Sequence, residues 1–173
     1  MTKFGFKEIS ASNWLEPDKV LQAFVRISPN GQSQTITGDE YLNHILKPKL
    51  VASVPKDLQT LFEVARGAMA YGYFFYPLYT LAAQQLFRVA DAAVIHKCKA
   101  LRAPKSKETF KKRIDWLMNE GTIPQSELNR WAAIRELRNI ASHPERQFIS
   151  TTGNAIGLLE GITEQINSLF SGS

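Results

Sequence analysis

Apolar residues recur at helical spacing through most of the chain from Lys56 onward. This pattern predicts helices, because side chains three and four positions apart share one helix face. The expected helical ranges are 57–73, 78–101, 108–119, 124–142 and 155–170. Short segments rich in proline, glycine and polar residues separate them, which favours antiparallel neighbours. The predicted fold is therefore all-α, an antiparallel helical bundle of four to five helices.

The first 54 residues follow a different pattern, in which prolines and glycines interrupt short apolar runs. We expect a short strand over 23–27 before a turn at 28–31, and a short helix over 39–46 that ends before Pro48. The predicted organisation is a small mixed N-terminal appendage over residues 1–54 and a helical bundle over 55–173.

Three helices carry clear candidate core positions, and in the last of them these positions are Ile156, Leu159, Ile162, Ile166 and Leu169. In the first, these positions are Leu58, Leu61, Phe62, Val64, Ala65, Ala68 and Met69. In the second, they are Leu81, Ala82, Leu86, Val89, Ala90, Ala93 and Val94.

The segment 67–87 contains no charged residue and is long enough to span a bilayer. However, it is rich in tyrosine and glutamine, and Pro77 divides it. A buried helical hairpin is therefore the favoured interpretation. Its aromatic cluster suits the core or a subunit contact, with a base-stacking platform as the alternative; the members are Tyr71, Tyr73, Phe74, Phe75, Tyr76 and Tyr79.

Composition adds little to the fold but bears on location. Hydrophobic residues make up 44% and charged residues 21% of the chain, as in ordinary soluble globular proteins. Cys98 is the one cysteine, and the N-terminus lacks the apolar run of a secretory signal. We expect a cytoplasmic protein with no membrane partner.

Positive charge is concentrated between Lys97 and Arg113. This segment has eight basic residues and one acidic residue, so it carries +7, whereas the whole chain carries +5. Such a segment attracts polyanions. The predicted RNA-binding residues are Lys105, Lys107, Lys111, Lys112 and Arg113. The alternative is a solvated, lysine-rich loop between helices.

The candidate chemistry lies at the end of the fourth helix. Arg138 follows Trp131 and Ile134 on the apolar face. A buried guanidinium requires an anion, so we expect an acidic side chain, a second subunit's site or a ligand phosphate to meet it. His143 precedes Pro144, which disfavours helical geometry at position 143, and His143 is therefore expected to be the first residue off the helix. An imidazole there can transfer a proton or bind phosphate, and Asn139 adds donors and an acceptor.

Structural interpretations of the same residues remain open. Arg138 is explained equally by an ion pair, and His143 by capping of the last helix carbonyls. A metal site is not expected, because His44, His96, Cys98 and His143 are scattered along the chain.

The motif Arg138-Asn139-x3-His143 at the end of a long helix resembles that of the HEPN superfamily. There an arginine, usually with a polar residue after it, precedes a histidine by four to six positions. Residues 131–139 and Pro144 are also similar to that superfamily. The resemblance extends over roughly 56–170.

This resemblance implies a metal-independent endoribonuclease without a cofactor, of the kind common among toxins and antiphage defence systems. It implies a homodimer in which both subunits contribute their motifs to one site, and for some members an antitoxin or nucleotidyltransferase partner. By position, Arg138 and His143 are the implied catalytic residues and Asn139 the supporting one. Asp91 and Arg88 are candidates for a supporting residue on an earlier helix.

Three hypotheses follow. The first is an RNase acting as a toxin or defence effector, for which the intact Arg138 and His143 pair argues. The second is a non-catalytic HEPN-like module that binds nucleotide, RNA or protein. The third is a helical scaffold whose basic segment has no function of its own.

Overall fold

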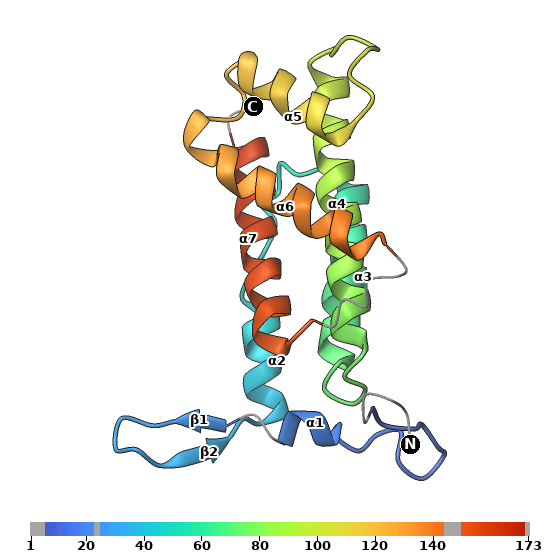
Figure 1. The fold of residues 1–173 in the computed structure, drawn as a ribbon, viewed down its shortest axis with the longest axis vertical. Helices are drawn as coiled ribbons and strands as arrows, with labels where there is room; N and C mark the ends of the chain where they lie inside the picture. The colour runs from blue at the N-terminus through green and yellow to red at the C-terminus, as the bar shows by residue number, and fades with distance from the viewer. Residues whose placement is uncertain (1–5, 23–24, 144–149, 172–173) are drawn as a thin grey trace.

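Helices account for nearly all the regular structure in the computed structural model, which describes residues 6–22, 25–143 and 150–171 (Figure 1). The five helices of the bundle are α3 (Lys56–Tyr71), α4 (Leu78–Ala100), α5 (Phe110–Asn119), α6 (Leu128–Ala141) and α7 (Thr152–Phe170). A 3₁₀ turn, Gln125–Glu127, precedes α6. The predicted all-α bundle is confirmed.

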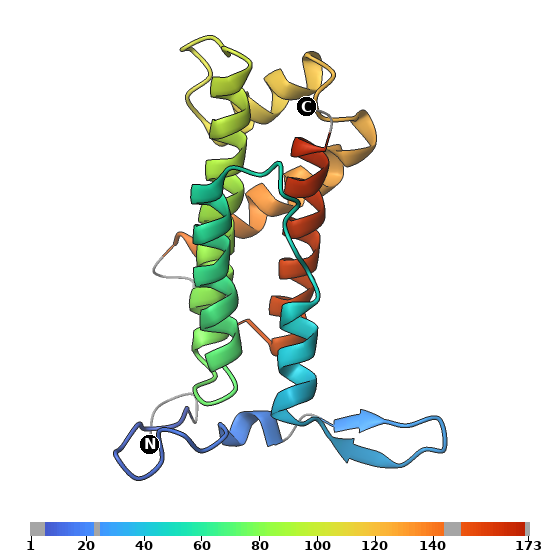
Figure 2. The same ribbon diagram turned by 180° about the vertical axis from the view of Figure 1, so that it is seen from behind.

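The long helices α3 and α4 form an antiparallel hairpin, and α7 packs beside α4 (Figures 1 and 2). The shorter α5 lies across one end, and α6 crosses over α4 and α7 at an angle (Figure 1). Because α6 carries the chain back toward the start of α4, α7 then runs in the same direction as α4 (Figure 1).

A single core joins these helices. It includes Phe62, Leu86, Leu117, Trp131 and Ile166, all nearly or fully buried. Two predicted core positions were wrong. Val64 is 56% exposed and Leu81 is 54% exposed, because the buried stripe of each helix is narrower than its apolar pattern.

The turn between α3 and α4 contains a close approach. A Cβ on Gly72 would lie 2.8 Å from Tyr79 Cε2, so glycine lets the ring pack against the backbone. The uncharged segment 67–87 therefore forms a hairpin with Met69 and Tyr79 buried, as predicted. Within the described ranges, no helix combines the length and apolar character needed to cross a bilayer.

The N-terminal segment contains α1 (Lys19–Gln22), β1 (Val25–Ile27), β2 (Ser33–Thr35) and α2 (Gly38–Leu46). The strands pair antiparallel, with Val25 opposite Thr35, and this hairpin projects from the bundle (Figures 1 and 2). The expected strand, turn and short helix are all present, although residues 23–24 lie outside the described residues.

This segment is attached through its own buried residues. Tyr41 and Ile45 of α2 enter the core that the bundle helices share. Asp18 is 1% exposed, and its Oδ2 accepts a hydrogen bond from the backbone N–H of Tyr76 at 2.8 Å. The N-terminal segment and the bundle therefore pack as one unit in the described part of the chain.

Candidate functional site

The Asp91 carboxylate on α4 holds the arginine that the sequence singled out. Arg138 lies in the last turn of α6, and its Nη2 donates a hydrogen bond to Asp91 Oδ2 at 3.1 Å. The sequence required an anion at Arg138, and in this chain an acidic side chain supplies it. The contact is partly open to solvent, since the Arg138 side chain is 36% exposed and that of Asp91 24%.

A second guanidinium approaches the other oxygen of the same carboxylate. Nη1 of Arg113, on α5, lies 3.7 Å from Asp91 Oδ1. This distance gives a Coulombic attraction but exceeds that of a hydrogen bond. Arg113 was expected in an exposed RNA-binding segment; the structure places it at Asp91 with only 21% of its side chain exposed.

An aromatic ring fixes the position of Arg138 from the α5 side. The Arg138 Cζ lies 5.7 Å from the centroid of the Phe110 ring, within the range of a cation–π contact. The Phe110 ring in turn packs against Trp131 of α6, with centroids 6.1 Å apart. Phe110 and Arg113 are three positions apart on α5, so one helix face supplies both contacts.

The N-cap of α5 sets this face. The Thr109 side chain accepts a hydrogen bond from the Lys112 N–H at 3.3 Å, and this N-cap makes Phe110 the first residue of the helix. The sequence pattern missed the role of Phe110, because nothing in the spacing shows that α5 crosses α4 beside Asp91.

A pocket of about 300 Å³ opens beside the Arg138–Asp91 pair. Its lining comes from α4 and from the end of α6: Gln84, Phe87, Arg88, Asp91, Arg138, Ala141 and Ser142. Two guanidiniums and one carboxylate therefore face one small space, and Arg113 adds a further positive charge at Asp91. Such an excess of positive charge favours an anionic ligand.

His143 lies where α6 has ended. The last helical residue is Ala141, and the Ser142 hydroxyl donates a hydrogen bond to the Arg138 carbonyl at 2.8 Å. The backbone N–H of His143 donates to the Ile140 carbonyl at 3.3 Å, and the residue is exposed. Ser142 is therefore the C-cap and His143 the second residue after the helix, one position later than expected, and Pro144 falls outside the described residues. Asn139 is exposed on the same turn as Arg138.

The basic segment divides into parts with different surroundings. Lys105 and Lys112 are exposed, Lys107 is half-buried, and Lys111 Nζ pairs with Asp115 at 2.6 Å. Lys97 is only 8% exposed, and its Nζ lies 5.6 Å from the Phe170 ring centroid. The exposed cations therefore form a surface near the end of the bundle that contains α5, separate from the pocket at Asp91.

His96 and Cys98, two of the residues considered as metal ligands, lie in different environments. His96 Nε2 lies 2.8 Å from Asp57 Oδ2, which connects α4 to the start of α3. Cys98 is buried, and burial raises the pKa of its thiol, while the Arg113 charge opposes that rise. Among the described residues, no cluster of three or more His, Cys, Asp or Glu side chains is suited to hold a metal ion.

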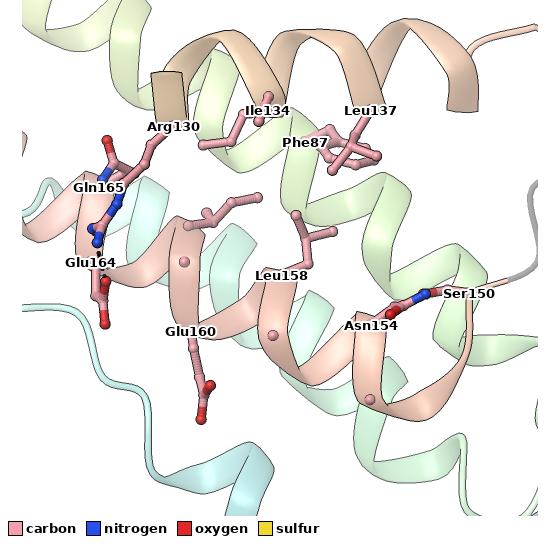
Figure 3. A pocket seen from close by; sticks show the side chains of 15 residues that line it. Phe87, Arg130, Ile134, Leu137, Ser150, Asn154, Leu158, Glu160, Glu164 and Gln165 are labelled. Carbon is pink, nitrogen blue, oxygen red and sulfur yellow. Dashed lines mark hydrogen bonds and ion pairs between the residues drawn. The ribbon is translucent and has the colours of Figure 1, made fainter. Parts of the chain in front are cut away.

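A second, larger hollow lies on the other flank of α6. This groove between α6 and α7 has a volume of about 730 Å³. Its lining side chains are drawn in Figure 3. Phe87, Ile134, Leu137 and Leu158 give it an apolar lining. At one end Arg130 Nη1 pairs with Glu164 at 3.1 Å. Sequence reasoning did not identify this groove, because it depends on the angle at which α6 crosses.

The fold and the site define an all-α bundle with an arginine-rich pocket at the end of one helix. A family model described as "Domain of unknown function (DUF4145)" matches residues 68–170, and the chain belongs to this family. The matched range runs from late α3 to the end of α7 and so includes Asp91, Arg138 and His143. No curated protein and no solved structure matches the chain.

Proposed function

We propose that this protein is a metal-independent endoribonuclease of toxin or antiphage-defence type, similar in mechanism to catalytic HEPN proteins. One observation carries the proposal. Arg138 is held by Asp91 at the rim of a cationic pocket, and the helix that carries it ends just before His143. A fixed guanidinium and an imidazole five positions later in the chain are groups that suit chemistry on a phosphodiester.

Arg138 has the capacity to bind a phosphate without releasing Asp91. A guanidinium carries five N–H donors, and Asp91 takes its hydrogen bond from Nη2. The remaining donors suit the non-bridging oxygens of a phosphate, whose negative charge increases as the phosphorane forms. Phe110 and Asp91 hold the guanidinium in place, which lowers the cost of ordering it at the moment of reaction.

The proposed reaction needs only groups from the RNA and the protein. The RNA 2′-oxygen attacks its own adjacent phosphorus, and the bond from phosphorus to the 5′-oxygen of the next nucleotide breaks. The products are a cyclic 2′,3′-phosphate and a 5′-hydroxyl. His143 acts as the general base for the 2′-hydroxyl or as the general acid for the leaving oxygen.

A homodimer provides both proton-transfer roles at one site. In this arrangement, each subunit brings its Arg138 and His143 to a shared cleft, and RNA phosphate offsets the positive charge of the two motifs. Mixing inactive Arg138→Ala and His143→Ala subunits tests this directly. Recovery of partial activity is expected for a shared cleft, and a mixture as inactive as its components would argue against it.

The decisive experiment is incubation with total RNA in EDTA. Cleavage by the wild type is expected, with a loss of at least about 100-fold in Arg138→Ala and His143→Ala, the size typical of general acid–base groups. Arg130→Ala is the matched control, because Arg130 lies on the same helix but pairs with Glu164. The absence of wild-type cleavage, or cleavage of DNA at a similar rate, would refute the proposal.

The alternative is a HEPN-like module that binds RNA, nucleotide or a protein partner without cutting. A specific observation favours it, namely that Arg138 already has a carboxylate partner and an aromatic contact within the chain. If the protein binds RNA but no cleavage products form, the result would support this binding function instead of the RNase. An antitoxin or nucleotidyltransferase partner is compatible with either activity.

A further inference from the structure

The ion pairs around Asp91 leave the neighbouring pocket with unbalanced positive charge. Asp91 Oδ2 receives Arg138 and Asp91 Oδ1 faces Arg113, so one carboxylate lies between two guanidiniums. Arg113 is absent from the pocket lining, so it acts on the pocket through its contact with Asp91. The positive charge of Arg113 offsets part of the negative charge of Asp91. Asp91 therefore neutralises less of the positive charge that Arg138 presents to the pocket.

Arg88 adds a third guanidinium, on the pocket side of Asp91. It lies three positions before Asp91 on α4, so both side chains emerge from the same helix face. Arg88 is exposed and lines the pocket together with Arg138. Among residues 6–22, 25–143 and 150–171, no carboxylate forms an ion pair with Arg88. By contrast, Arg66 pairs with Glu63 at 2.7 Å and Arg130 pairs with Glu164 at 3.1 Å.

The other lining residues are consistent with a small polar anion. Gln84 provides an amide, whereas the Ser142 hydroxyl already donates its proton to the Arg138 carbonyl. The volume of about 300 Å³ limits the pocket to a group of modest size. Guanidiniums from two helices can contact different oxygens of one tetrahedral anion, and their planar geometry allows paired hydrogen bonds that an ammonium cannot reproduce.

We propose that Arg88 is a second phosphate-binding residue, which with Arg138 binds one phosphodiester group in this pocket. The identity of that phosphodiester as RNA rests on the proposed function. Arg113 is assigned a positioning role, because it reaches the ligand only through its effect on Asp91.

The test measures binding separately from cleavage. The probe is a fluorescein-labelled single-stranded 2′-O-methyl RNA, which has no free 2′-hydroxyl and cannot react. Anisotropy titrations over a range of KCl concentrations compare the wild type with Arg88→Ala, Arg88→Lys and Arg130→Ala. Thermal unfolding of each variant establishes that it is folded.

We expect Arg88→Ala to bind about tenfold more weakly, in keeping with the loss of a charge-assisted contact. The slope of log K against log salt should fall by about 0.7, the value for one contact to a single-strand phosphate. Arg88→Lys should recover the slope but only part of the affinity. Arg130→Ala removes the same charge and should leave both quantities near wild type.

The outcomes separate this inference from the proposed function. Equal effects of Arg88→Ala and Arg130→Ala would overturn the role of Arg88, even if the wild type cleaves RNA. A specific loss in Arg88→Ala would support the phosphate site, even if no cleavage is found and the RNase proposal fails. Wild-type protein that does not bind the probe would overturn the role of Arg88 as well.

Discussion

Asp91 on α4 and Arg138 on α6 are 47 positions apart in sequence, yet Arg138 Nη2 donates to Asp91 Oδ2 at 3.1 Å. This contact fixes the C-terminal end of α6 over α4, beside the point where α5 crosses. It also places the arginine of the Arg-x4-His motif at a carboxylate that a second arginine shares. The Asp91 carboxylate on α4 therefore connects α4 to α5 and α6, and it also sets the charge around Arg138 in the candidate site.

Replacing Asp91 should destabilise the protein, because Asp91→Ala leaves Arg113 and Arg138 without their shared anion. Because these side chains are partly exposed, the free energy of unfolding should fall by only about 1–2 kcal/mol, which is less than for a fully buried ion pair. Urea unfolding at neutral pH measures it. Asp115→Ala is the control, since it removes the exposed pair with Lys111 and should cost less than about 0.5 kcal/mol. Similar losses in the two variants would show that the Asp91 pairs contribute no more than a surface ion pair.

The lysines near α5 should affect RNA binding through charge alone. Changing Lys105, Lys107, Lys111 and Lys112 together to alanine should weaken binding of single-stranded RNA and lower the salt slope by up to about 3. A smaller change is expected if Lys111 remains committed to Asp115. The measurement is the salt dependence of anisotropy with 2′-O-methyl RNA.

A control with the same change in net charge is available elsewhere on the surface. Lys19, Lys47, Lys49 and Lys56 are all exposed and lie outside the basic segment. Their joint replacement should leave the salt slope close to wild type. A slope unchanged by either set would show that the basic segment does not contact RNA.

Helical periodicity was sufficient to predict the bundle, because buried side chains recur along each long helix. The same periodicity did not predict the ends of the helices as well. The last helix was expected from Ala155, but it begins at Thr152, because the Thr151 side chain accepts a hydrogen bond from the Asn154 N–H at 3.2 Å. The capped first turn of α7 therefore includes Gly153 and Asn154, which lie before the expected start.

The candidate site was predictable only in part. The apolar face of α6 placed Arg138 toward the core and so required an anion. The resemblance singled out Asp91 and Arg88 on the earlier helix, but the pairing of Asp91 with Arg138 depends on where α4 and α6 cross. The roles of Arg113 and Phe110 depend likewise on the packing of α5. The rule that a residue before proline leaves helical geometry placed the end of α6 at Ser142, whereas the helix ends one residue earlier, at Ala141.

The buried Tyr79 should make the protein sensitive to alkali. Tyr79 is fully buried, and burial raises the pKa of its hydroxyl, with a smaller contribution from nearby Tyr41. Below the ordinary pKa of about 10, the hydroxyl is protonated in both states. Above that pH the unfolded chain releases the proton and the folded chain retains it, so stability falls as pH rises, by about 1.4 kcal/mol per pH unit for one group.

Urea midpoints between neutral and strongly alkaline pH test this effect. Tyr79→Phe removes the titrating group and should make the alkaline loss of stability less steep. Tyr71→Phe is the control, because Tyr71 is 65% exposed. Identical pH profiles for the two variants would show that Tyr79 is not the source of the alkaline sensitivity.

Two glycines should respond to alanine in opposite directions. Gly157 lies on α7 and lines the groove between α6 and α7, and a Cβ added there meets no atom within 4 Å. Gly157→Ala should therefore stabilise the protein by about 0.5–1 kcal/mol, because alanine loses less backbone entropy in a helix. At Gly72, a Cβ would lie 2.8 Å from Tyr79 Cε2 and 2.9 Å from the Met69 carbonyl oxygen. Gly72→Ala should destabilise by about 1–3 kcal/mol, since both neighbours belong to the packed hairpin turn. Urea unfolding of the two variants provides the comparison, and a shift of the same sign in both would contradict the close packing of Tyr79 on the α3–α4 turn.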